Sequence, residues 1–139
     1  VDLQPEEDPE LLEKIQSKNI DLIRLVTPTT NENRLKTILK NASGFLYYVT
    51  ITGITGQHSP EIEQLRQSIQ KVKKLSTLPV VAGFGIKNAT QVKNVCSFSD
   101  GAVMGSSIVK IIEENLENNK DLILTNISNF AIGLKKGIN

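Results

Sequence analysis

Glycine-rich turns follow three apolar runs of the sequence, and their composition is suited to binding an anion. The turns occupy residues 52–56, 83–86 and 105–107. A phosphate needs several N–H donors close together, and glycine keeps the backbone accessible to it. The segment Gly105-Ser106-Ser107 leads directly into a helical pattern, and a helix start supplies free N–H groups and a partial positive charge. These residues therefore predict a phosphate site; the alternative is that they only allow close packing of a strand on a helix.

The other residues with chemical potential do not combine into a catalytic group. His58, the only histidine, lies in a polar loop, and the pattern around it favours a solvated side chain. Cys96 lies on an apolar helix face and is interpreted as a core residue. Lys110 is interpreted as a solvated lysine, and Asp2 is the only carboxylate near the end of a predicted strand. The sequence contains no close acid pair, nucleophile elbow, metal-ligand spacing or P-loop, so we expect an anion site with neither catalytic acids nor a metal.

Short apolar, β-branched runs alternate with helical patterns along the chain. Strands are predicted at residues 20–26, 45–51, 79–84 and 102–104, and their near-continuous apolarity is typical of a parallel sheet. Tyr47 and Tyr48 are neighbours on the second strand, so their side chains must point to opposite faces. One is expected to face a barrel interior or a ligand, and the other a helix.

Capping signals place the starts of the predicted helices. A helix is expected at residues 7–18, and Thr29-Thr30-Asn31-Glu32 has the spacing of a capping box for the next one. Ser59-Pro60 and Asn88 are the starts predicted for two more helices. Apolar residues at intervals of three and four predict one helix after the turn at 105–107 and a last helix near the C-terminus.

Strands that alternate with helices favour a parallel α/β architecture, either a doubly wound sheet or a (β/α)₈ barrel. A complete barrel takes about 250 residues, so 139 residues would supply about half of one. In barrels the loops after strands 7 and 8 commonly bind phosphate. Two small-residue turns after the last two strands fit that pattern, which favours phosphate binding over packing alone.

Bulk composition narrows the possible classes of protein. The net charge of +1 gives no indication of a nucleic acid or an anionic membrane as partner. A single cysteine excludes a disulfide within the chain and suggests a reducing compartment. No apolar run approaches the roughly 20 residues of a membrane helix. The chain opens on Val1, and its first residues read as the tail of a strand, so we expect an incomplete chain forming one partial domain at 1–139.

Four segments together resemble the tryptophan synthase alpha subunit family. They are DLQPEE at 2–7, YYVTITGITG at 47–56, GFGI at 83–86 and GAVMGSSIVKIIE at 101–113. The resemblance implies a (β/α)₈ TIM barrel, of which this chain is the C-terminal half, from the end of strand 4 to helix 8. It also implies a lyase that cleaves indole-3-glycerol phosphate to indole and glyceraldehyde 3-phosphate in tryptophan biosynthesis.

The resemblance further implies roles for individual residues. The family's catalytic Glu and Asp belong to the first half of the barrel, so no catalytic residue is expected here. Thr55 matches a loop threonine that bonds the catalytic Asp when the mobile loop closes. Tyr47 matches a tyrosine that lines the indole pocket, and Phe84 an aromatic wall near it. The phosphate-binding positions correspond to Gly56, Gly85, Gly105 and Ser106.

Partners and location follow from the same resemblance. It implies an α₂β₂ complex in which indole passes to the beta subunit; pyridoxal phosphate belongs to that subunit, so no cofactor is expected here. A plastid (chloroplast) stroma or a bacterial cytoplasm is the expected compartment. Two alternatives remain open at this stage: another phosphate-binding barrel, for example of histidine biosynthesis, and a non-catalytic half-barrel that binds a phosphate or a partner.

Overall fold

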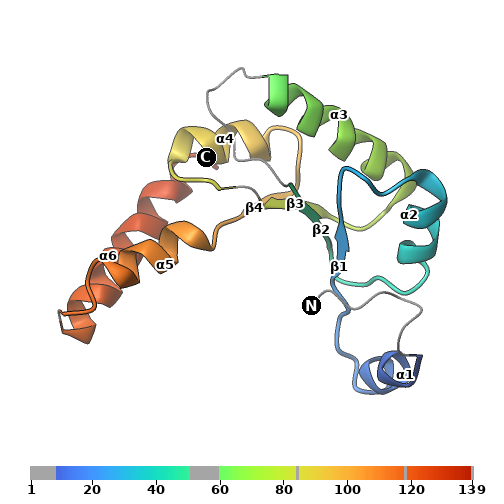
Figure 1. The fold of residues 1–139 in the computed structure, drawn as a ribbon, viewed down its shortest axis with the longest axis horizontal. Coiled ribbons are helices and arrows are strands. Elements are labelled where there is room, and N and C mark those ends of the chain that lie inside the picture. The colour runs from blue at the N-terminus through green and yellow to red at the C-terminus, as the bar shows by residue number, and fades with distance from the viewer. Residues whose placement is uncertain (1–8, 51–59, 84, 118, 139) are drawn as a thin grey trace.

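Four parallel strands form one sheet in the computed structural model, which describes residues 9–83 apart from 51–59, and 85–138 apart from 118. Their order in the sheet is their order in the chain (Figure 1). Consecutive neighbours that are all parallel are what half of a (β/α)₈ barrel requires. The strands are β1 (Arg24–Val26), β2 (Leu46–Val49), β3 (Val80–Gly83) and β4 (Gly101–Val103).

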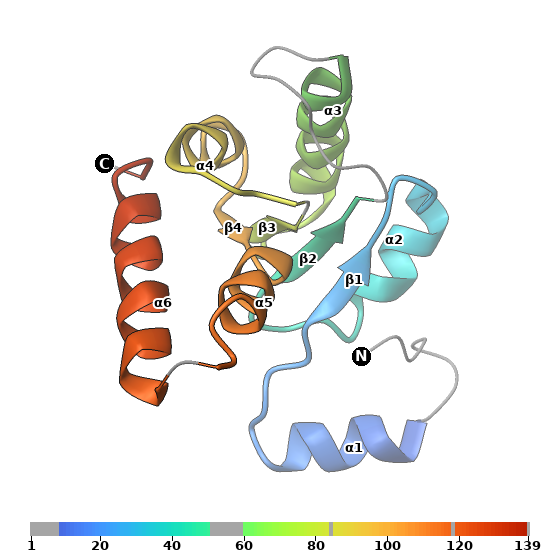
Figure 2. The ribbon, with the colours of Figure 1, turned by 60° about the vertical axis from the view of Figure 1, so that its left-hand side comes forward.

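Helices connect the strands and follow the last one, as predicted. Each of the first three strands is followed by one helix, which brings the chain back to start the next parallel strand. Two helices follow β4, the first of them short (Figure 2). The helices are α1 (Pro9–Ser17), α2 (Glu32–Leu39), α3 (Pro60–Leu75), α4 (Ala89–Cys96), α5 (Ser106–Glu113) and α6 (Lys120–Lys135).

The first strand is shorter than predicted because its leading residues bond to a loop instead of a neighbouring strand. Leu22 N–H donates to Ser43 Oγ at 2.8 Å, and Ser43 N–H donates to the Leu22 carbonyl at 3.1 Å. The ladder with β2 starts only at Arg24, which pairs with Leu46. Apolar composition predicted the strand, whereas its hydrogen-bond partners set its length.

The start of α2 corrects the predicted capping box. Asn31 is the N-cap, and its side chain accepts from Arg34 N–H at 2.9 Å. Thr29, the predicted cap, instead has its Oγ1 2.9 Å from Thr27 Oγ1, and Thr30 Oγ1 accepts from Thr27 N–H at 3.1 Å in the preceding turn. An asparagine oxygen caps at least as well as threonine, so the helix begins two residues after Thr30. The predictions for Pro60 and Asn88 are confirmed: Pro60 is the first residue of α3, and Asn88 accepts from Gln91 N–H.

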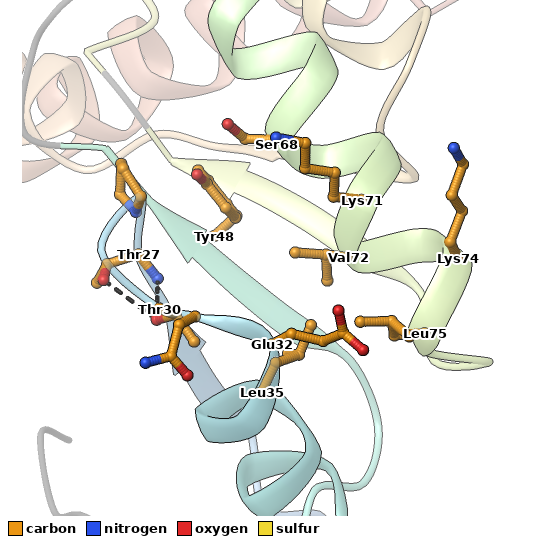
Figure 3. A pocket seen from close by; sticks show the side chains of 12 residues that line it. Thr27, Thr30, Glu32, Leu35, Tyr48, Ser68, Lys71, Val72, Lys74 and Leu75 are labelled. Atoms are coloured by element: carbon orange, nitrogen blue, oxygen red, sulfur yellow. Dashed lines mark hydrogen bonds between the residues drawn. The ribbon is translucent and has the colours of Figure 1, made fainter.

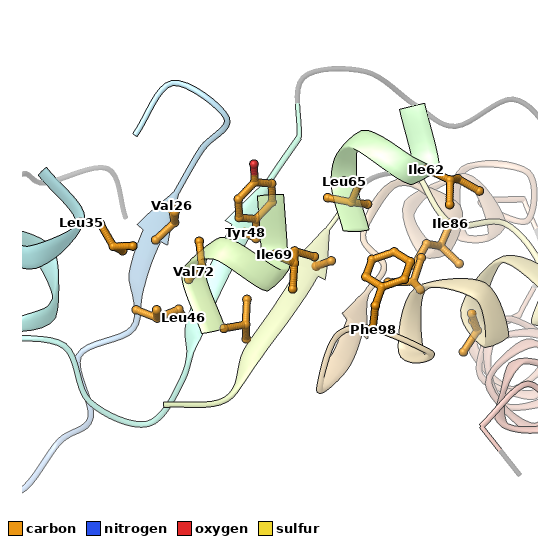
Figure 4. Close-up of a cluster of buried hydrophobic side chains, with 14 of the residues drawn as sticks. Val26, Leu35, Leu46, Tyr48, Ile62, Leu65, Ile69, Val72, Ile86 and Phe98 are labelled. Atoms are coloured by element: carbon orange, nitrogen blue, oxygen red, sulfur yellow. The ribbon is translucent and has the colours of Figure 1, made fainter. Parts of the chain in front are cut away.

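The main core lies between the sheet and the helices packed on one of its faces (Figure 4). Along the strands every second side chain enters this core, as the period of a strand requires. The predicted stripe of α3 packs against them, with Ile69 fully buried. The strand contribution is Val26, Leu46, Tyr48, Val80 and Ala82, and that of α3 is Ile62, Leu65, Ile69 and Val72.

Alternate residues on the opposite face of the sheet are only partly buried. Leu25, Tyr47 and Val81 lie in register across three neighbouring strands on this face. In a closed barrel this is the face that turns toward the interior. Tyr48 is buried and Tyr47 is half-buried, so the prediction that the two tyrosines serve opposite faces is confirmed.

Polar contacts tie the strands together at the edge where they begin. Asp100 accepts from Val80 N–H at 2.8 Å and from Lys73 Nζ at 2.7 Å, which joins the starts of β3 and β4 to the end of α3. Ser99 Oγ donates to the carbonyls of Val95 and Gly101. In barrels this edge serves stability, which leaves the opposite edge for function.

Candidate functional site

Two of the predicted turns meet at the edge where the strands end. Gly83 of β3 pairs with Val103 of β4. Gly85 and Gly105 each follow two residues later, so the parallel register brings both turns to the same edge of the sheet. Ser106 then begins α5, and the position before it is the N-cap Gly105.

Among the residues that the structure describes, none demands a glycine at position 105. Its φ of −118° and ψ of −63° are accessible to any residue, and a Cβ added there would meet no atom within 4 Å. No side chain caps α5 either, whereas the asparagine N-caps of α2, α4 and α6 each accept a bond from their helix. Gly105 and Ser106 are both exposed. The helix start thus presents open space beside its backbone, where an anion can approach the N–H groups.

Gly85 is a glycine for a different reason. Its φ is +50°, in the left-handed region that side chains rarely adopt. This conformation turns the chain directly after β3, and the next residue, Ile86, carries its side chain into the core with 1% of its surface exposed. Gly85 itself remains exposed at the strand edge.

A hydrogen bond joins the two turns. Ser107 Oγ donates to the Ile86 carbonyl at 2.8 Å. The first turn of α5 is therefore fastened to the loop that carries Gly85. Sequence reasoning treated Ser107 only as a small residue, because the partner of its hydroxyl is 21 residues away in the chain.

Tyr47 also reaches toward this edge. A Cβ at Gly83 would lie 2.6 Å from Tyr47 Cζ and would collide with the phenol oxygen. Gly83 thus provides the room that the tyrosine ring occupies on the inner face of the sheet. This function of Gly83 was also missed in the sequence, where it read only as the start of a turn.

Several candidates lie outside the described residues or outside this edge. Thr55, Gly56, Phe84, His58 and Asp2 are not among the described residues. Lys110 is confirmed as an exposed lysine, with its Nζ 3.6 Å from Glu114. Burial raises the pKa of the half-buried Cys96 thiol, which disfavours a reactive thiolate.

Two further features of the described residues bear on the class of site. Within them, no group of three or more His, Cys, Asp or Glu residues is placed to hold a metal. No helix among them is long and apolar enough to cross a membrane.

A separate cavity of about 430 Å³ lies between α2 and α3, on the helix-covered side of the sheet (Figure 3). Tyr48 and Ser68 line it; burial raises the pKa of the Tyr48 phenol, and a hydrogen bond with Ser68 partly opposes that rise. Thr27 and Thr30 also line the cavity, and they form hydrogen bonds with each other. The cavity contains none of the predicted site residues. The strand-end edge has the exposed helix start that an anion needs, so we place the candidate site there.

Comparison with known proteins identifies a family. The family model described as tryptophan synthase alpha chain matches residues 1–139. The chain is 42% identical over 134 residues to the tryptophan synthase alpha chain of Petrotoga mobilis, covering 96% of this chain and 52% of that one. It thus spans about half the length of this curated relative.

Solved structures resemble the model in the same way. Tryptophan synthase subunit alpha from Legionella pneumophila superposes with a TM-score of 0.84 at 30% identity, covering 99% of this chain and 50% of that chain. The aminoacrylate-bound tryptophan synthase from M. tuberculosis gives a TM-score of 0.80 at 23% identity and supports the fold alone; the match covers 99% of this chain and 48% of that chain. The predicted TIM-barrel fold is confirmed, with four parallel strands as half of the barrel.

Proposed function

This chain belongs to the tryptophan synthase alpha chain family, and we propose that it supplies the phosphate-binding half of a subunit that cleaves indole-3-glycerol phosphate. The family is one of lyase-type enzymes of tryptophan biosynthesis. In this proposal residues 1–139 form a partial barrel domain. The products are indole and glyceraldehyde 3-phosphate.

One observation carries the proposal: no described residue near Gly105 requires it to be a glycine. Its backbone is unstrained, and the space beside it is open. A ligand that comes close to the backbone at the start of α5 explains both features. The short helix after the last strand has the position of the phosphate-binding helix found in many barrels.

The described turns together with the family resemblance, which alone assigns Thr55, Gly56 and Phe84, support a division of the substrate into two ends. The phosphate would accept N–H bonds from Gly85, Gly105 and Ser106, with Gly56 completing this end. The indole would lie on the inner face, against Tyr47 and Phe84, with Thr55 supporting the catalytic Asp. Phosphate binding far from the bond that breaks supplies energy that holds the reacting atoms in place.

We propose that the catalytic acids of the reaction are not among the candidate site residues named above. Cleavage requires an acid that protonates the indole ring at C3, a group that assists at the ring nitrogen, and a base for the glycerol hydroxyl. The family resemblance places the catalytic Glu and Asp in the first half of the barrel. This half would then bind and orient the substrate for them.

Cofactor and partner follow from the family. Alpha chains of this family need no cofactor, and pyridoxal phosphate belongs to the beta subunit. We propose that the protein pairs with a beta subunit as α₂β₂ and hands indole to it. A bacterial cytoplasm or a plastid stroma is the compartment that we propose.

A chimera tests the proposal. Residues 1–139 are joined behind the first half of the Petrotoga mobilis alpha chain, the portion that this chain does not match, and indole release from indole-3-glycerol phosphate is followed. We expect turnover by the chimera and none by residues 1–139 alone. The same chimera with Gly105→Asp is the matched control, and it should fold but release indole at least about fivefold more slowly than the unmutated chimera at low substrate concentration. Turnover by residues 1–139 alone, or a folded chimera that binds glycerol 3-phosphate without releasing indole, would contradict the proposal.

A further inference from the structure

The peptide unit between Ile86 and Lys87 is held at both ends by side chains from two different helices. Its carbonyl oxygen accepts from Ser107 Oγ of α5 at 2.8 Å. Its N–H group donates to Gln91 Oε1 of α4 at 2.7 Å. The carbonyl and the N–H of a trans peptide point in opposite directions, so two bonds of this kind fix the rotation of the peptide plane.

This clamped peptide is one residue removed from Gly85. Gly85 has no side chain to anchor it, and because it lacks a Cβ its backbone can rotate more freely than that of other residues; its φ in this structure is +50°. The buried side chain of Ile86 fixes the position of this residue, and the two hydrogen bonds to the following peptide fix the orientation of that peptide. The position of Gly85 relative to α5 therefore depends on the bond from Ser107.

We infer that Ser107 is a positioning residue that sets the spacing between the two halves of the proposed phosphate site. This inference rests on the proposed function, because it assigns to Ser107 a task in binding the same phosphate. One half of the site is the Gly85 turn and the other is the start of α5 at Gly105 and Ser106. The hydroxyl of Ser107 bonds to protein, so it acts through the Gly85 turn.

The physical reason is preorganisation of the N–H donors. An anion gains most from donors that already point to one spot, because ordering them during binding costs free energy. Without the Ser107 hydroxyl the Ile86 carbonyl loses its partner in a partly buried place, and the turn can rotate to seek another. The donors would then have to be ordered again each time phosphate binds.

The test is calorimetric titration of glycerol 3-phosphate into the chimera with the Petrotoga mobilis first half and into its variants. Ser107→Ala should weaken binding by about fivefold to tenfold, the effect of losing one net hydrogen bond. Ser107→Thr keeps the hydroxyl and should restore most of the affinity. Gln91→Ala loosens the other end of the same peptide, so its effect should combine non-additively with that of Ser107→Ala.

A matched control exists at the opposite end of β4. Ser99 Oγ also donates to backbone carbonyls, those of Val95 and Gly101, but at the edge where the strands begin. Ser99→Ala should lower the melting temperature and leave glycerol 3-phosphate affinity unchanged. In the cleavage assay Ser107→Ala should lower kcat/KM by about the same factor as the glycerol 3-phosphate affinity, because remote binding energy also holds the reacting atoms in place.

The outcomes separate the two claims. Wild-type protein that binds no glycerol 3-phosphate would overturn the proposed function, and this inference with it. Wild-type binding that Ser107→Ala leaves intact would overturn the role of Ser107 while the proposed function stands. A loss of affinity that Ser107→Thr fails to restore, or that Ser99→Ala matches, would mean that Ser107 only stabilises the fold.

Discussion

Replacing Gly105 by aspartate should weaken phosphate binding strongly and slightly stabilise the start of α5. The fold tolerates the side chain, because a Cβ at this position meets nothing within 4 Å and the backbone angles suit any residue. A carboxylate at a helix N-terminus interacts favourably with the helix dipole by about 0.3–1 kcal/mol. An aspartate side chain at position 105 is not expected to cap the helix. The ψ of Gly105 is −63°, whereas the capping residue Asn88 has an extended backbone with a ψ of 166°.

The cost to binding is electrostatic and steric. Two unit charges 4 Å apart repel by about 1 kcal/mol in bulk water and about 4 kcal/mol at an effective dielectric constant of 20. Gly105 is exposed in this structure, so the repulsion lies between these limits. The dissociation constant should rise by about fivefold to about a thousandfold, in addition to the effect of bulk.

The assay is calorimetric titration of glycerol 3-phosphate into the chimera with the Petrotoga mobilis first half, with a thermal melt of each variant. Gly105→Asn is the matched control, because it has nearly the same shape without the charge. Raising the salt concentration should narrow the gap between the Asp and Asn variants, since salt screens exposed charges. If Gly105→Asp binds as tightly as the wild type, the phosphate site is elsewhere and the open space at Gly105 has no function.

Three further predictions concern the scaffold. Gly83→Ala should lower the free energy of unfolding by about 1–3 kcal/mol, because the new Cβ forces Tyr47 to move. Urea denaturation measures this change, and an unchanged midpoint would contradict the close contact between Gly83 and the Tyr47 ring. Burial alone would raise the pKa of Asp100, but the hydrogen bonds from Lys73 and Val80 and the charge of Lys73 outweigh it and lower the pKa. Because the folded pKa of Asp100 is lowered, its stabilisation is present above the unfolded pKa and disappears as the pH falls through the folded one. Asp100→Asn should therefore be less stable than wild type at pH 7, and the difference should shrink as the pH falls below the ordinary aspartate pKa of about 3.9; a difference that stays constant with pH would refute this. Ile69→Ala should lower the free energy of unfolding by about 2–5 kcal/mol, while Leu124→Ala, at an exposed position, should change it by less than about 0.5 kcal/mol; equal losses would contradict the placement of the core.

The architecture was predictable from the sequence because alternation and strand parity are local signals. The order of strands and helices, the opposite faces of Tyr47 and Tyr48, and the Asn88 cap all follow from patterns a few residues long. The prediction of a capping box at Thr29 was wrong, because several side-chain oxygens in this segment, including those of Thr30 and Asn31, compete for a few backbone N–H groups. Sequence spacing alone does not decide which oxygen obtains which donor.

The contacts that shape the candidate site were not predictable in the same way. The bond from Ser107 to Ile86 and the space that Gly83 leaves for Tyr47 both join residues on different strands or loops. They depend on the register of neighbouring strands, which no local pattern reveals. The small residues at 105–107 did indicate the candidate site, but only the structure separates Gly105, which the described residues do not require to be glycine, from Gly85, which its positive φ requires.

A crystal structure of the chimera with indole-3-glycerol phosphate bound would test the central claim most directly. We predict phosphate oxygens within hydrogen-bond distance of the backbone nitrogens of Gly105 and Ser106, with the Gly85 turn on the other side and the indole ring against Tyr47. A phosphate bound in the cavity between α2 and α3, or an α5 start that stays empty while substrate binds elsewhere, would contradict the account.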